Sequence, residues 1–373
     1  MSQDKPIRVA QVMGKMLGGG VEAVVMNYYR HIDHSLVQFD FLVDEDSTLV
    51  PREEIEALGG RVFVVPPYQR LPRYLSELKG LFRREGWQVV HSHINSLSVF
   101  PLSAAKHAGV PVRVAHSHSA TGRGEKLPKL LMKEALRTQA NRYPTHRLAC
   151  GELAGGWLFG GEPYGVVRNA VDLEAFAYSS EARARVRTEL GVPEGHLLVG
   201  HVGRFSPQKN QEWLCGVLSG LLARVPDACL ALAGDGPDRA RAEQRFAQAG
   251  LSSSVLFLGQ RADVSELYSA FDAFVLPSLY EGMPLVAVEA QRSGCPCLLS
   301  DAVTREVEVT GGVRFLPLGD PGAWARELER IALEGPLDRV AAGADPRISE
   351  YNIEAAAPRL VEFYEQALTE VGA

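Results

Sequence analysis

The sequence predicts an α/β fold in which helices cover parallel sheets. Its 373 residues are 46% hydrophobic and 23% charged, which is typical of a globular protein with room for two cores. Short apolar runs alternate with helical patterns along the chain, and several runs end at a glycine or a histidine. This βαβ rhythm implies parallel strands with the functional residues at their carboxyl ends.

Charge is distributed unevenly along the chain. Residues 1–172 hold 21 Lys and Arg against 17 Asp and Glu, net +4, and residues 173–373 hold 18 against 28, net −10, which sum to −6. A basic first half favours an anionic ligand, but its basic residues are not interleaved with aromatic ones, which disfavours nucleic acid. No run of 18 apolar residues and no signal-peptide pattern occurs, so we expect a cytoplasmic protein. The odd number of cysteines, five, argues against a disulfide framework.

The first half opens with an expected strand at residues 7–13, a glycine-rich loop at 14–20 and a helix through 23–29. A dinucleotide-binding loop needs glycine where Met16 stands, and a Walker A loop needs Ser or Thr after Gly-Lys. Neither NAD nor an ordinary P-loop nucleotide fits this loop.

Two His-x-His pairs end later strands. The strands are expected at residues 38–43, 62–65, 88–91 and 112–116, with helices through 74–84 and 104–108. His91 and His93 form one pair, and His116 and His118 form the other. No carboxylate or cysteine accompanies them at ligand spacing, so we predict no metal site. A histidine at the carboxyl end of a strand is expected to meet a substrate.

Residues 122–143 are the most basic segment, with six Lys and Arg against two Glu and with leucines at helical spacing. One interpretation is a solvated surface helix. The other is a helix that rests on anionic lipid headgroups, which would place the protein at the inner face of the cytoplasmic membrane.

The second half begins with a strand at residues 197–202, and Gly203, Arg204 and Lys209 follow it. Two cations five residues apart, after a buried strand and a glycine, suit an oxygen-rich anion. Arg204 can bind such an anion in a fork, and Lys209 can bind it as a point charge. Further strands are expected at residues 230–234 and 255–259.

Residues 271–299 carry two carboxylates. They predict a buried strand at 273–276, a turn with Glu281 at its lip, a helix that begins near 283–285 and contains Glu289, and a second apolar strand. If the chain between them rose by about 1.5 Å per residue, as in a helix, the two carboxylates would lie about 12 Å apart along the helix axis. This distance suits the two ends of one elongated ligand. Glu289 stands among apolar residues and therefore needs a partner, either a protein donor or the hydroxyl groups of a ligand.

The turn before this helix favours an anion. Gly282 lets a ligand approach the backbone, Pro284 suits a first helical turn, and the free N–H groups there attract negative charge. A ligand that is rich in hydroxyls at both ends and anionic between them is a nucleotide-sugar.

The stretch Glu281-Gly-Met-Pro-Leu-Val-Ala-Val-Glu289, between PSLY and GCP, resembles the E-x7-E motif of retaining glycosyltransferases with the GT-B fold. The family is glycosyltransferase family 4, and the capsular and exopolysaccharide enzymes resemble this chain most. Gly19-Gly-Val-Glu22 resembles the GG-x-E turn of that family, and the segment from Gly203 to Lys209 resembles its G-R-x-x-x-x-K.

This resemblance implies two Rossmann-like domains that face each other across a cleft. Residues 166–176 resemble the family's linker, although Arg168 and Ala170 replace its usual Pro and Gly. We therefore expect an acceptor-binding domain at 1–170 and a nucleotide-sugar-binding domain at 171–373. The final helix, at about 354–369, is expected to pack back on the first domain.

The resemblance also implies site residues. The catalytic residues are expected to be His118, Glu281, Arg204 and Lys209. The donor is expected to contact Gly19, Gly20, Arg204, Lys209, Gly282, Met283, Pro284, Leu285 and Glu289. Because Arg204 and Lys209 would hold the diphosphate, no metal or cofactor is expected. His116 is the alternative to His118, and His93 is expected near the acceptor.

The implied activity is retaining, metal-independent transfer of a hexose from a nucleoside diphosphate sugar, with UDP as the expected nucleotide. The expected acceptor is a glycan or a polyprenyl-linked glycan of surface polysaccharide biosynthesis. Two alternatives remain. A GT-B nucleotide-sugar epimerase would share the donor site, and a noncatalytic sugar-binding subunit would bind the donor without turnover.

Overall fold

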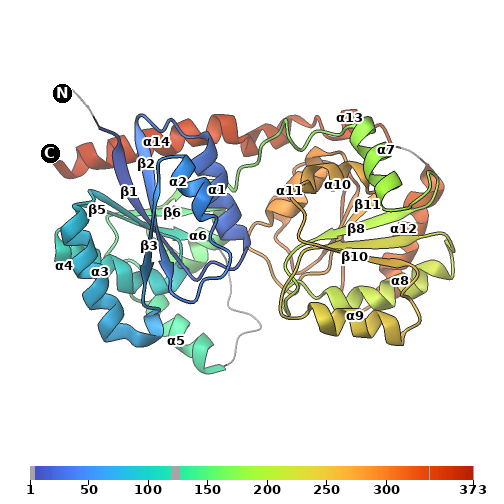
Figure 1. Ribbon diagram of the computed structural model, residues 1–373, viewed down its shortest axis with the longest axis horizontal. Coiled ribbons are helices and arrows are strands. Elements are labelled where there is room, and N and C mark those ends of the chain that lie inside the picture. The colour runs from blue at the N-terminus through green and yellow to red at the C-terminus, as the bar shows by residue number, and fades with distance from the viewer. Residues whose placement is uncertain (1–4, 119–126, 336, 373) are drawn as a thin grey trace. The chain divides into compact units, whose positions relative to one another are not determined.

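The computed structural model describes residues 5–118, 127–335 and 337–372. The chain divides into two compact units, Met1–Ala170 with Ile353–Ala373, and Val171–Asn352 (Figure 1). Each unit holds its own parallel sheet and its own buried apolar core. The predicted α/β class with two parallel sheets is confirmed.

The first unit is built on a sheet with the strand order β3-β2-β1-β4-β5-β6-β7, all parallel within the described residues. All eight residues of β2 are buried, because helices cover both faces of the sheet. The strands are β1 (Ile7–Gly14), β2 (Val37–Asp44), β3 (Arg61–Val65), β4 (Val89–Ser92), β5 (Val112–Ser117), β6 (His146–Ala149) and β7 (Gly165–Val166).

Helices of the first unit lie on both sides of this sheet. The strand order reverses between β1 and β4, so right-handed crossovers place α1 on one face and α3 and α4 on the other (Figure 1). The final helix α14 packs against α1. The helices are α1 (Gly20–His31), α2 (Arg52–Ala57), η1 (Tyr68–Arg70), α3 (Leu71–Glu85), η2 (Asn95–Ser98), α4 (Val99–Ala108), α5 (Leu127–Arg137), α6 (Glu152–Phe159) and α14 (Ile353–Gly372).

The second unit repeats the plan with the strand order β10-β9-β8-β11-β12-β13. Here the order reverses between β8 and β11, and α8 packs with α12 while α7 packs with α10 (Figure 1). The strands are β8 (Leu198–Val202), β9 (Cys229–Ala233), β10 (Val255–Gly259), β11 (Ala273–Leu276), β12 (Cys297–Ser300) and β13 (Val313–Leu316). The helices are α7 (Ser180–Glu189), η3 (Gln211–Trp213), α8 (Leu214–Leu222), α9 (Arg239–Gln248), α10 (Val264–Ala270), α11 (Leu285–Arg292), η4 (Arg305–Val307), α12 (Pro321–Glu334), α13 (Arg339–Ala342) and η5 (Pro346–Tyr351).

The reversal points decide where each unit can bind a ligand, because the loops on either side of such a point diverge and leave the strand ends accessible. In the first unit the loops after β1 and β4 lie there, and in the second unit the loops after β8 and β11.

All five cysteines are free, in agreement with the expectation of no disulfide framework.

Candidate active site

The loop after β8 packs closely against the loop after β9. Gly234 and Gly236 have φ of +133° and +154°. A Cβ atom on Gly234 would lie 2.2 Å from the carbonyl oxygen of Gly203, and one on Gly236 would lie 2.3 Å from that of Phe205. Glycine is required at both positions, because a side chain there would push away the loop that carries Arg204 and Lys209.

Lys209 pairs with Glu281 across the reversal point of the second sheet. The Lys209 Nζ atom lies 2.8 Å from Glu281 Oε1, and the two side chains are 16% and 9% exposed. The Ser278 hydroxyl donates to the same carboxylate oxygen at 2.8 Å, and the Gln208 amide donates to the other at 3.2 Å. The loops after β8 and β11 are thereby fixed to each other.

Arg204 has a different environment from Lys209. Its side chain is partly buried, and its carbonyl oxygen accepts a hydrogen bond from the Gln211 amide at 2.9 Å. Within the described part of the chain, no carboxylate lies at ion-pair distance from the Arg204 guanidinium. Among the described residues, this loop therefore presents a cation without a carboxylate partner.

The helix α11 begins next to this loop, with Pro284 as its N-cap. The side chains of Met283, Pro284 and Leu285 are buried, so their backbone is what a ligand could contact. As at every helix start, the first N–H groups have no acceptor within the helix and carry partial positive charge. The segment from Glu281 to Pro284 is not helical, so a helical rise does not describe the spacing of Glu281 and Glu289, and the separation of about 12 Å stays a prediction.

Glu289 is the fifth residue of α11 and is partly buried. The hydroxyl of Tyr268, a buried residue of α10, donates to its carboxylate at 2.9 Å. Burial raises the pKa of Glu289 to about 7, although the Tyr268 hydrogen bond and the Lys209 charge oppose the rise. The partner that the sequence required is thus a protein hydroxyl on one carboxylate oxygen.

Glu289→Gln is expected to stabilise the protein at about pH 8 and to leave its stability unchanged near pH 4.5. The folded pKa lies above the unfolded value of 4.5, so the free energy of unfolding falls as pH rises from 4.5 to about 7. One pKa unit corresponds to about 1.36 kcal/mol, and partial exposure reduces the effect, so we expect a gain of about 1–2 kcal/mol at the higher pH.

Urea unfolding at both pH values measures this gain, and Glu243→Gln, an exposed side chain of α9, is the matched control. An equal effect of Glu289→Gln at both pH values would contradict the assignment.

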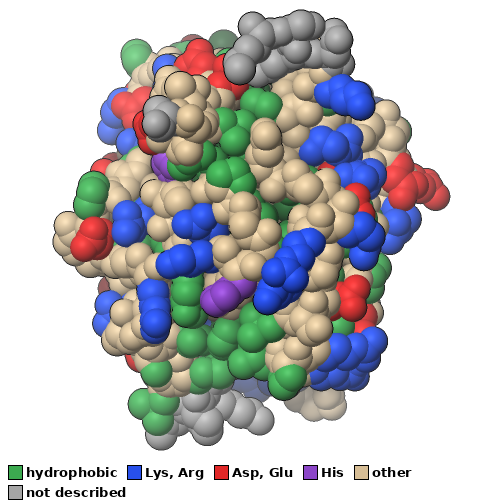
Figure 2. Space-filling view, turned by 90° about the vertical axis from the view of Figure 1, so that its left-hand side faces the viewer, with side chains coloured by type: hydrophobic (Ala, Val, Ile, Leu, Met, Phe, Trp, Pro, Cys, Tyr) green, Lys and Arg blue, Asp and Glu red, His purple; other side chains and the backbone are tan. Residues whose placement is uncertain are grey.

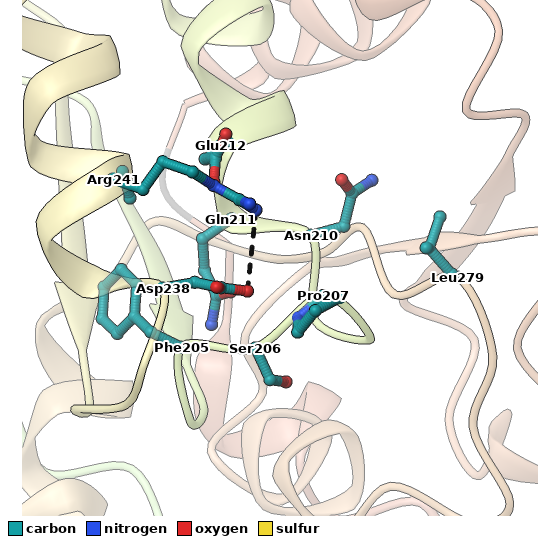
Figure 3. Close-up of a pocket in the computed structure, with 10 residues that line it drawn as sticks. Phe205, Ser206, Pro207, Asn210, Gln211, Glu212, Asp238, Arg241 and Leu279 are labelled. Carbon is teal, nitrogen blue, oxygen red and sulfur yellow. Dashed lines mark hydrogen bonds and ion pairs between the residues drawn. The ribbon is translucent and has the colours of Figure 1, made fainter. Parts of the chain in front are cut away.

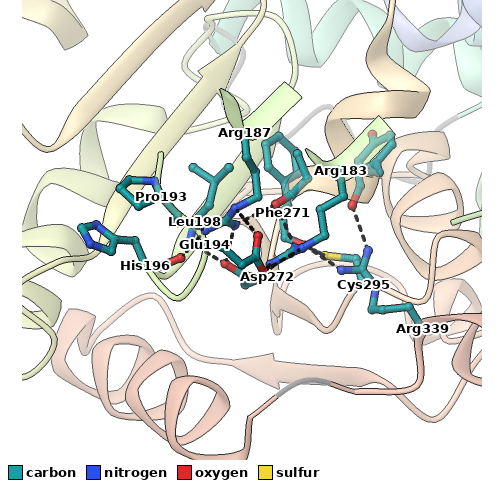
Figure 4. A network of polar contacts seen from close by, with 12 residues as sticks. Arg183, Arg187, Pro193, Glu194, His196, Leu198, Phe271, Asp272, Cys295 and Arg339 are labelled. Atoms are coloured by element: carbon teal, nitrogen blue, oxygen red, sulfur yellow. Dashed lines mark hydrogen bonds and ion pairs between the residues drawn. The ribbon is translucent and has the colours of Figure 1, made fainter. Parts of the chain in front are cut away.

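Arg339 is a residue of this region that the sequence did not reveal. Its buried guanidinium donates to the carbonyl oxygens of Ser293, Phe271 and Tyr268 at 2.9, 2.7 and 2.8 Å (Figure 4). It therefore holds the end of α11 and the residue that bonds Glu289. In the sequence, only Gly294 pointed to a close contact here. A Cβ atom at that position would lie 2.0 Å from the Arg339 carbonyl oxygen.

A cavity of about 240 Å³ lies on another side of the loop after β8 (Figure 3). Arg241 of α9 lies 3.6 Å from Asp238, the N-cap of the same helix, and also pairs with Glu212. Among the described residues, none of the predicted site residues lines it. The lining residues are Phe205, Ser206, Pro207, Asn210, Gln211, Glu212, Asp238, Arg241, Ala242 and Leu279.

The first unit brings its two His-x-His pairs together at the ends of β4 and β5. His93 Nδ1 lies 2.9 Å from His118 Nε2, and His91 Nε2 lies 3.1 Å from His116 Nδ1. Burial lowers the pKa of all four, that of His118 to about 3, so the rings are neutral at physiological pH. His116 and His118, the two alternatives for the active-site histidine, thus belong to one cluster.

The glycine-rich loop of the first unit ends at Gly19, the N-cap of α1, and Gly20 is the first residue of that helix. The Glu22 carboxylate accepts hydrogen bonds from the N–H groups of Gly19 and Leu17 at 2.6 and 2.8 Å. These bonds hold the loop while the Gly20 position stays open, since nothing lies within 4 Å of a Cβ built there.

The basic segment 122–143 lies partly outside the described residues, which exclude 122–126. Its described part contains α5, where Leu131 is 60% exposed and Arg137 pairs with Glu134 at 2.8 Å. One face of the first unit carries more Lys and Arg than Asp and Glu side chains (Figure 2). Within the described residues, no helix combines the length and apolarity needed to cross a bilayer. The membrane contact stays a prediction.

Two family models match the chain. One, described as "Glycosyl transferases group 1", matches residues 196–333, and the other, a "Glycosyl transferase 4-like domain", matches residues 19–157.

Curated relatives match most of the chain. The putative glycosyltransferase EpsF of Bacillus subtilis (strain 168) is 39% identical over 343 residues, which are 88% of each chain. The UDP-Gal:alpha-D-GlcNAc-diphosphoundecaprenol alpha-1,3-galactosyltransferase of Escherichia coli is 28% identical over 317 residues, 80% of this chain and 81% of that one.

Solved structures share the fold. HepE of Anabaena in complex with UDP-glucose has a TM-score of 0.78 at 20% identity and covers 96% of this chain and 99% of its own. WaaG, a glycosyltransferase involved in lipopolysaccharide biosynthesis, has a TM-score of 0.75 at 15% identity, with 95% and 99% covered. The predicted GT-B fold is confirmed.

Proposed function

The chain belongs to the group 1 glycosyl transferases, and on that premise we propose that it transfers a hexose from a UDP-sugar to a glycan or lipid-linked acceptor, with retention at the anomeric carbon. The observation that carries the proposal is the arrangement after β8 and β11. These two loops lie where the strand order of the second sheet reverses. They carry Arg204, the ion pair Lys209–Glu281 and the start of α11.

The proposed step breaks the bond between the anomeric carbon and the diphosphate, and negative charge develops on the leaving oxygen. Arg204 stabilises that charge in a fork, and Lys209 does so as a point charge. The N–H groups at the start of α11, near Gly282, add the helix dipole. We propose that these groups take the place of a divalent metal in this step.

The two carboxylates recognise the two ends of the donor. Glu281 accepts hydrogen bonds from hydroxyls of the sugar, since its oxygens are held in place by Ser278, Gln208 and Lys209. Glu289 accepts from the ribose hydroxyls with the lone pairs that Tyr268 leaves free. In this arrangement Lys209 contacts both the diphosphate and Glu281, the carboxylate that binds the sugar.

In the first unit, His118 is proposed to position the sugar as charge develops, and Gly19 and Gly20 to admit the diphosphate. The open space at Gly20 and the hydrogen bonds of Glu22 support the role of this loop. The acceptor hydroxyl is proposed to attack from the face that the diphosphate leaves, without a covalent intermediate on the protein.

The comparisons support the donor and the setting. HepE was solved with UDP and with UDP-glucose, and the name of the E. coli relative describes transfer from UDP-Gal to a diphosphoundecaprenol-linked sugar. For this chain we therefore propose a UDP-sugar donor, a polyprenyl-linked glycan acceptor and a role in surface polysaccharide assembly at the membrane.

Calorimetry with a panel of nucleotide-sugars, with and without EDTA, tests the proposal. We expect one UDP-sugar to bind the wild-type protein equally in both buffers. Glu289→Ala is expected to weaken its binding by about 10–100-fold, because a hydrogen bond to a charged group contributes about 1.5–3 kcal/mol. The control Glu243→Ala removes an exposed carboxylate of α9 and should bind like wild type.

Product analysis distinguishes a transferase from an epimerase and from a noncatalytic subunit. Mass spectrometry of reactions with a lipid-linked acceptor should show transfer of the sugar. Binding that requires metal, or no binding at all, would refute the assigned roles. An altered free nucleotide-sugar without acceptor would favour an epimerase, and binding without any turnover would favour a noncatalytic subunit.

A further inference from the structure

Four histidines of the first unit form a buried cluster, which we call the histidine cluster. Its members His91, His93, His116 and His118 are 1, 5, 2 and 7% exposed. The rings stack in pairs, with centroids 4.2 Å apart for His91 and His93 and 4.0 Å apart for His116 and His118. Polar side chains buried to this degree need partners, and these rings find them mainly in one another.

Three rings of the cluster turn nitrogen atoms toward a common region. One nitrogen from each of His91, His93 and His116 lies within 4.8 Å of the other two. The nitrogens of three imidazoles on one tetrahedral zinc ion, each about 2.0–2.1 Å from the metal, lie about 3.4 Å apart. The three rings would therefore need to turn until their nitrogens reach this spacing.

The outward nitrogens of two rings have the partners that metal-binding histidines usually have. His91 Nδ1 lies 2.7 Å from the Tyr364 hydroxyl, and His93 Nε2 lies 2.8 Å from the Gln11 amide oxygen. If each outward nitrogen donates its hydrogen, His91 Nε2 and His93 Nδ1 present lone pairs to the cluster. Gln11 also donates to Tyr364 at 3.2 Å, so the two acceptors hold each other in place.

A small cavity adjoins these rings. A cavity of about 10 Å³ is lined by the three histidines together with Gln11 and Tyr364 and with neighbouring apolar residues. This volume is about that of one water molecule. His116 Nε2 and His118 Nδ1 are buried without a hydrogen-bond partner among the described residues. The hydrogen-bonded cluster therefore leaves buried polar atoms unsatisfied.

We propose that His91, His93 and His116 bind one Zn²⁺ ion, with a water molecule as the fourth ligand. Imidazole ligands suit zinc and its transition-metal neighbours, whereas Mg²⁺ and Ca²⁺ prefer oxygen, and no carboxylate belongs to this group among the described residues. The expectation of no metal site rested on the absence of a third ligand near each His-x-His pair in the sequence. Pairing of β4 with β5 supplies that ligand from the other pair.

This site lies within the first unit, and its ligand His93 contacts His118, the residue proposed to position the sugar, at 2.9 Å. The proposal does not rest on the proposed transfer reaction. Gln11 and Tyr364 act on the metal through the ligands that they orient, so they are positioning residues.

Zinc titration of the untagged full-length chain, stripped of metal with EDTA and then freed of chelator, tests the proposal. We expect one Zn²⁺ per chain and a higher unfolding temperature with zinc, because binding to the folded state stabilises it. Co²⁺ in place of Zn²⁺ should give the visible absorption of a tetrahedral site, and Mg²⁺ should have no effect.

Three variants test whether zinc binds at the histidine cluster. His93→Gln is expected to weaken zinc binding by at least about 100-fold. Gln11→Leu keeps all three ligands and is expected to weaken it by about 10–100-fold, the usual effect of removing the partner of a ligating histidine. His107→Gln changes an exposed histidine of α4 and should bind zinc like wild type.

If His93→Gln fails to fold, Gln11→Leu and the cobalt spectrum still decide. Absence of stoichiometric zinc binding by wild type would overturn the proposal. So would unchanged zinc binding by Gln11→Leu, or an equal loss in His107→Gln.

Discussion

Lys209→Ala is expected to lower kcat/KM for sugar transfer by about 10²–10³-fold, the loss seen when one fixed stabiliser of a developing anion is removed. Lys209 is the cation that contacts Glu281, so its removal acts on the leaving diphosphate and on sugar recognition together. A steady-state assay with the UDP-sugar identified by calorimetry measures the effect.

The same change leaves Glu281, only 9% exposed, without its cation. Part of any loss could therefore come from a less stable protein, because an unpaired buried charge is destabilising. The double variant Lys209→Ala/Glu281→Gln removes both charges and should regain stability while it stays inactive. Recovery of activity in the double variant would show that Lys209 has only a structural role.

Arg224→Ala provides the matched control for Lys209→Ala. Arg224 also pairs with a glutamate, Glu329 at 3.3 Å, but both side chains are about one-third exposed. We expect its kcat/KM to remain within about twofold of wild type, because surface ion pairs contribute little.

Asp272→Ala is expected to lower the free energy of unfolding by about 3–5 kcal/mol, the effect of removing one partner of a buried ion pair. Asp272 accepts from Arg187 at 3.0 Å, from Arg183 at 2.8 Å and from the backbone N–H of Leu198 at 2.7 Å (Figure 4). Arg187 is 2% exposed, so without Asp272 its buried charge would keep only Glu194, a 72% exposed side chain, as a carboxylate partner. Urea unfolding followed by circular dichroism measures the loss.

Two further variants distinguish the loss of the Asp272 charge from the loss of its hydrogen bonds. Asp272→Asn keeps an acceptor for Leu198 and should lose less stability than Asp272→Ala. Glu194→Ala removes a 72% exposed carboxylate that contacts the same two arginines, Arg183 and Arg187. It should cost less than about 1 kcal/mol, as exposed ion pairs do. An equal loss in Glu194→Ala and Asp272→Ala would contradict this account.

The sequence predicted the strands near each reversal point well. Residues 273–276 form β11, as expected, because four consecutive apolar residues between turn signals can be buried on both faces of a parallel sheet. β6, β7 and β13 were not predicted. β6 is only four residues long and contains His146 and Arg147, so it has no apolar run, and its pairing with β5 makes it a strand.

The residue types of the candidate site were also readable from the sequence. Glycines after strands, two cations in one loop and Glu289 among apolar residues are all visible in the sequence. Their partners were not readable. Tyr268 and Glu289 are 21 residues apart, and the pairing of Lys209 with Glu281 spans 72 residues, so only folding brings them together.

The sequence by itself determined the α/β class, the periodic core and the chemical types at the strand ends, because these depend on local periodicity and on residue chemistry. Tertiary structure decided which of those groups meet. It paired Lys209 with Glu281, placed Arg339 at the C-terminal end of α11 and joined two His-x-His pairs into one cluster. The physical reason is that side-chain contacts between neighbouring parallel strands depend on strand order and register, which no local pattern records.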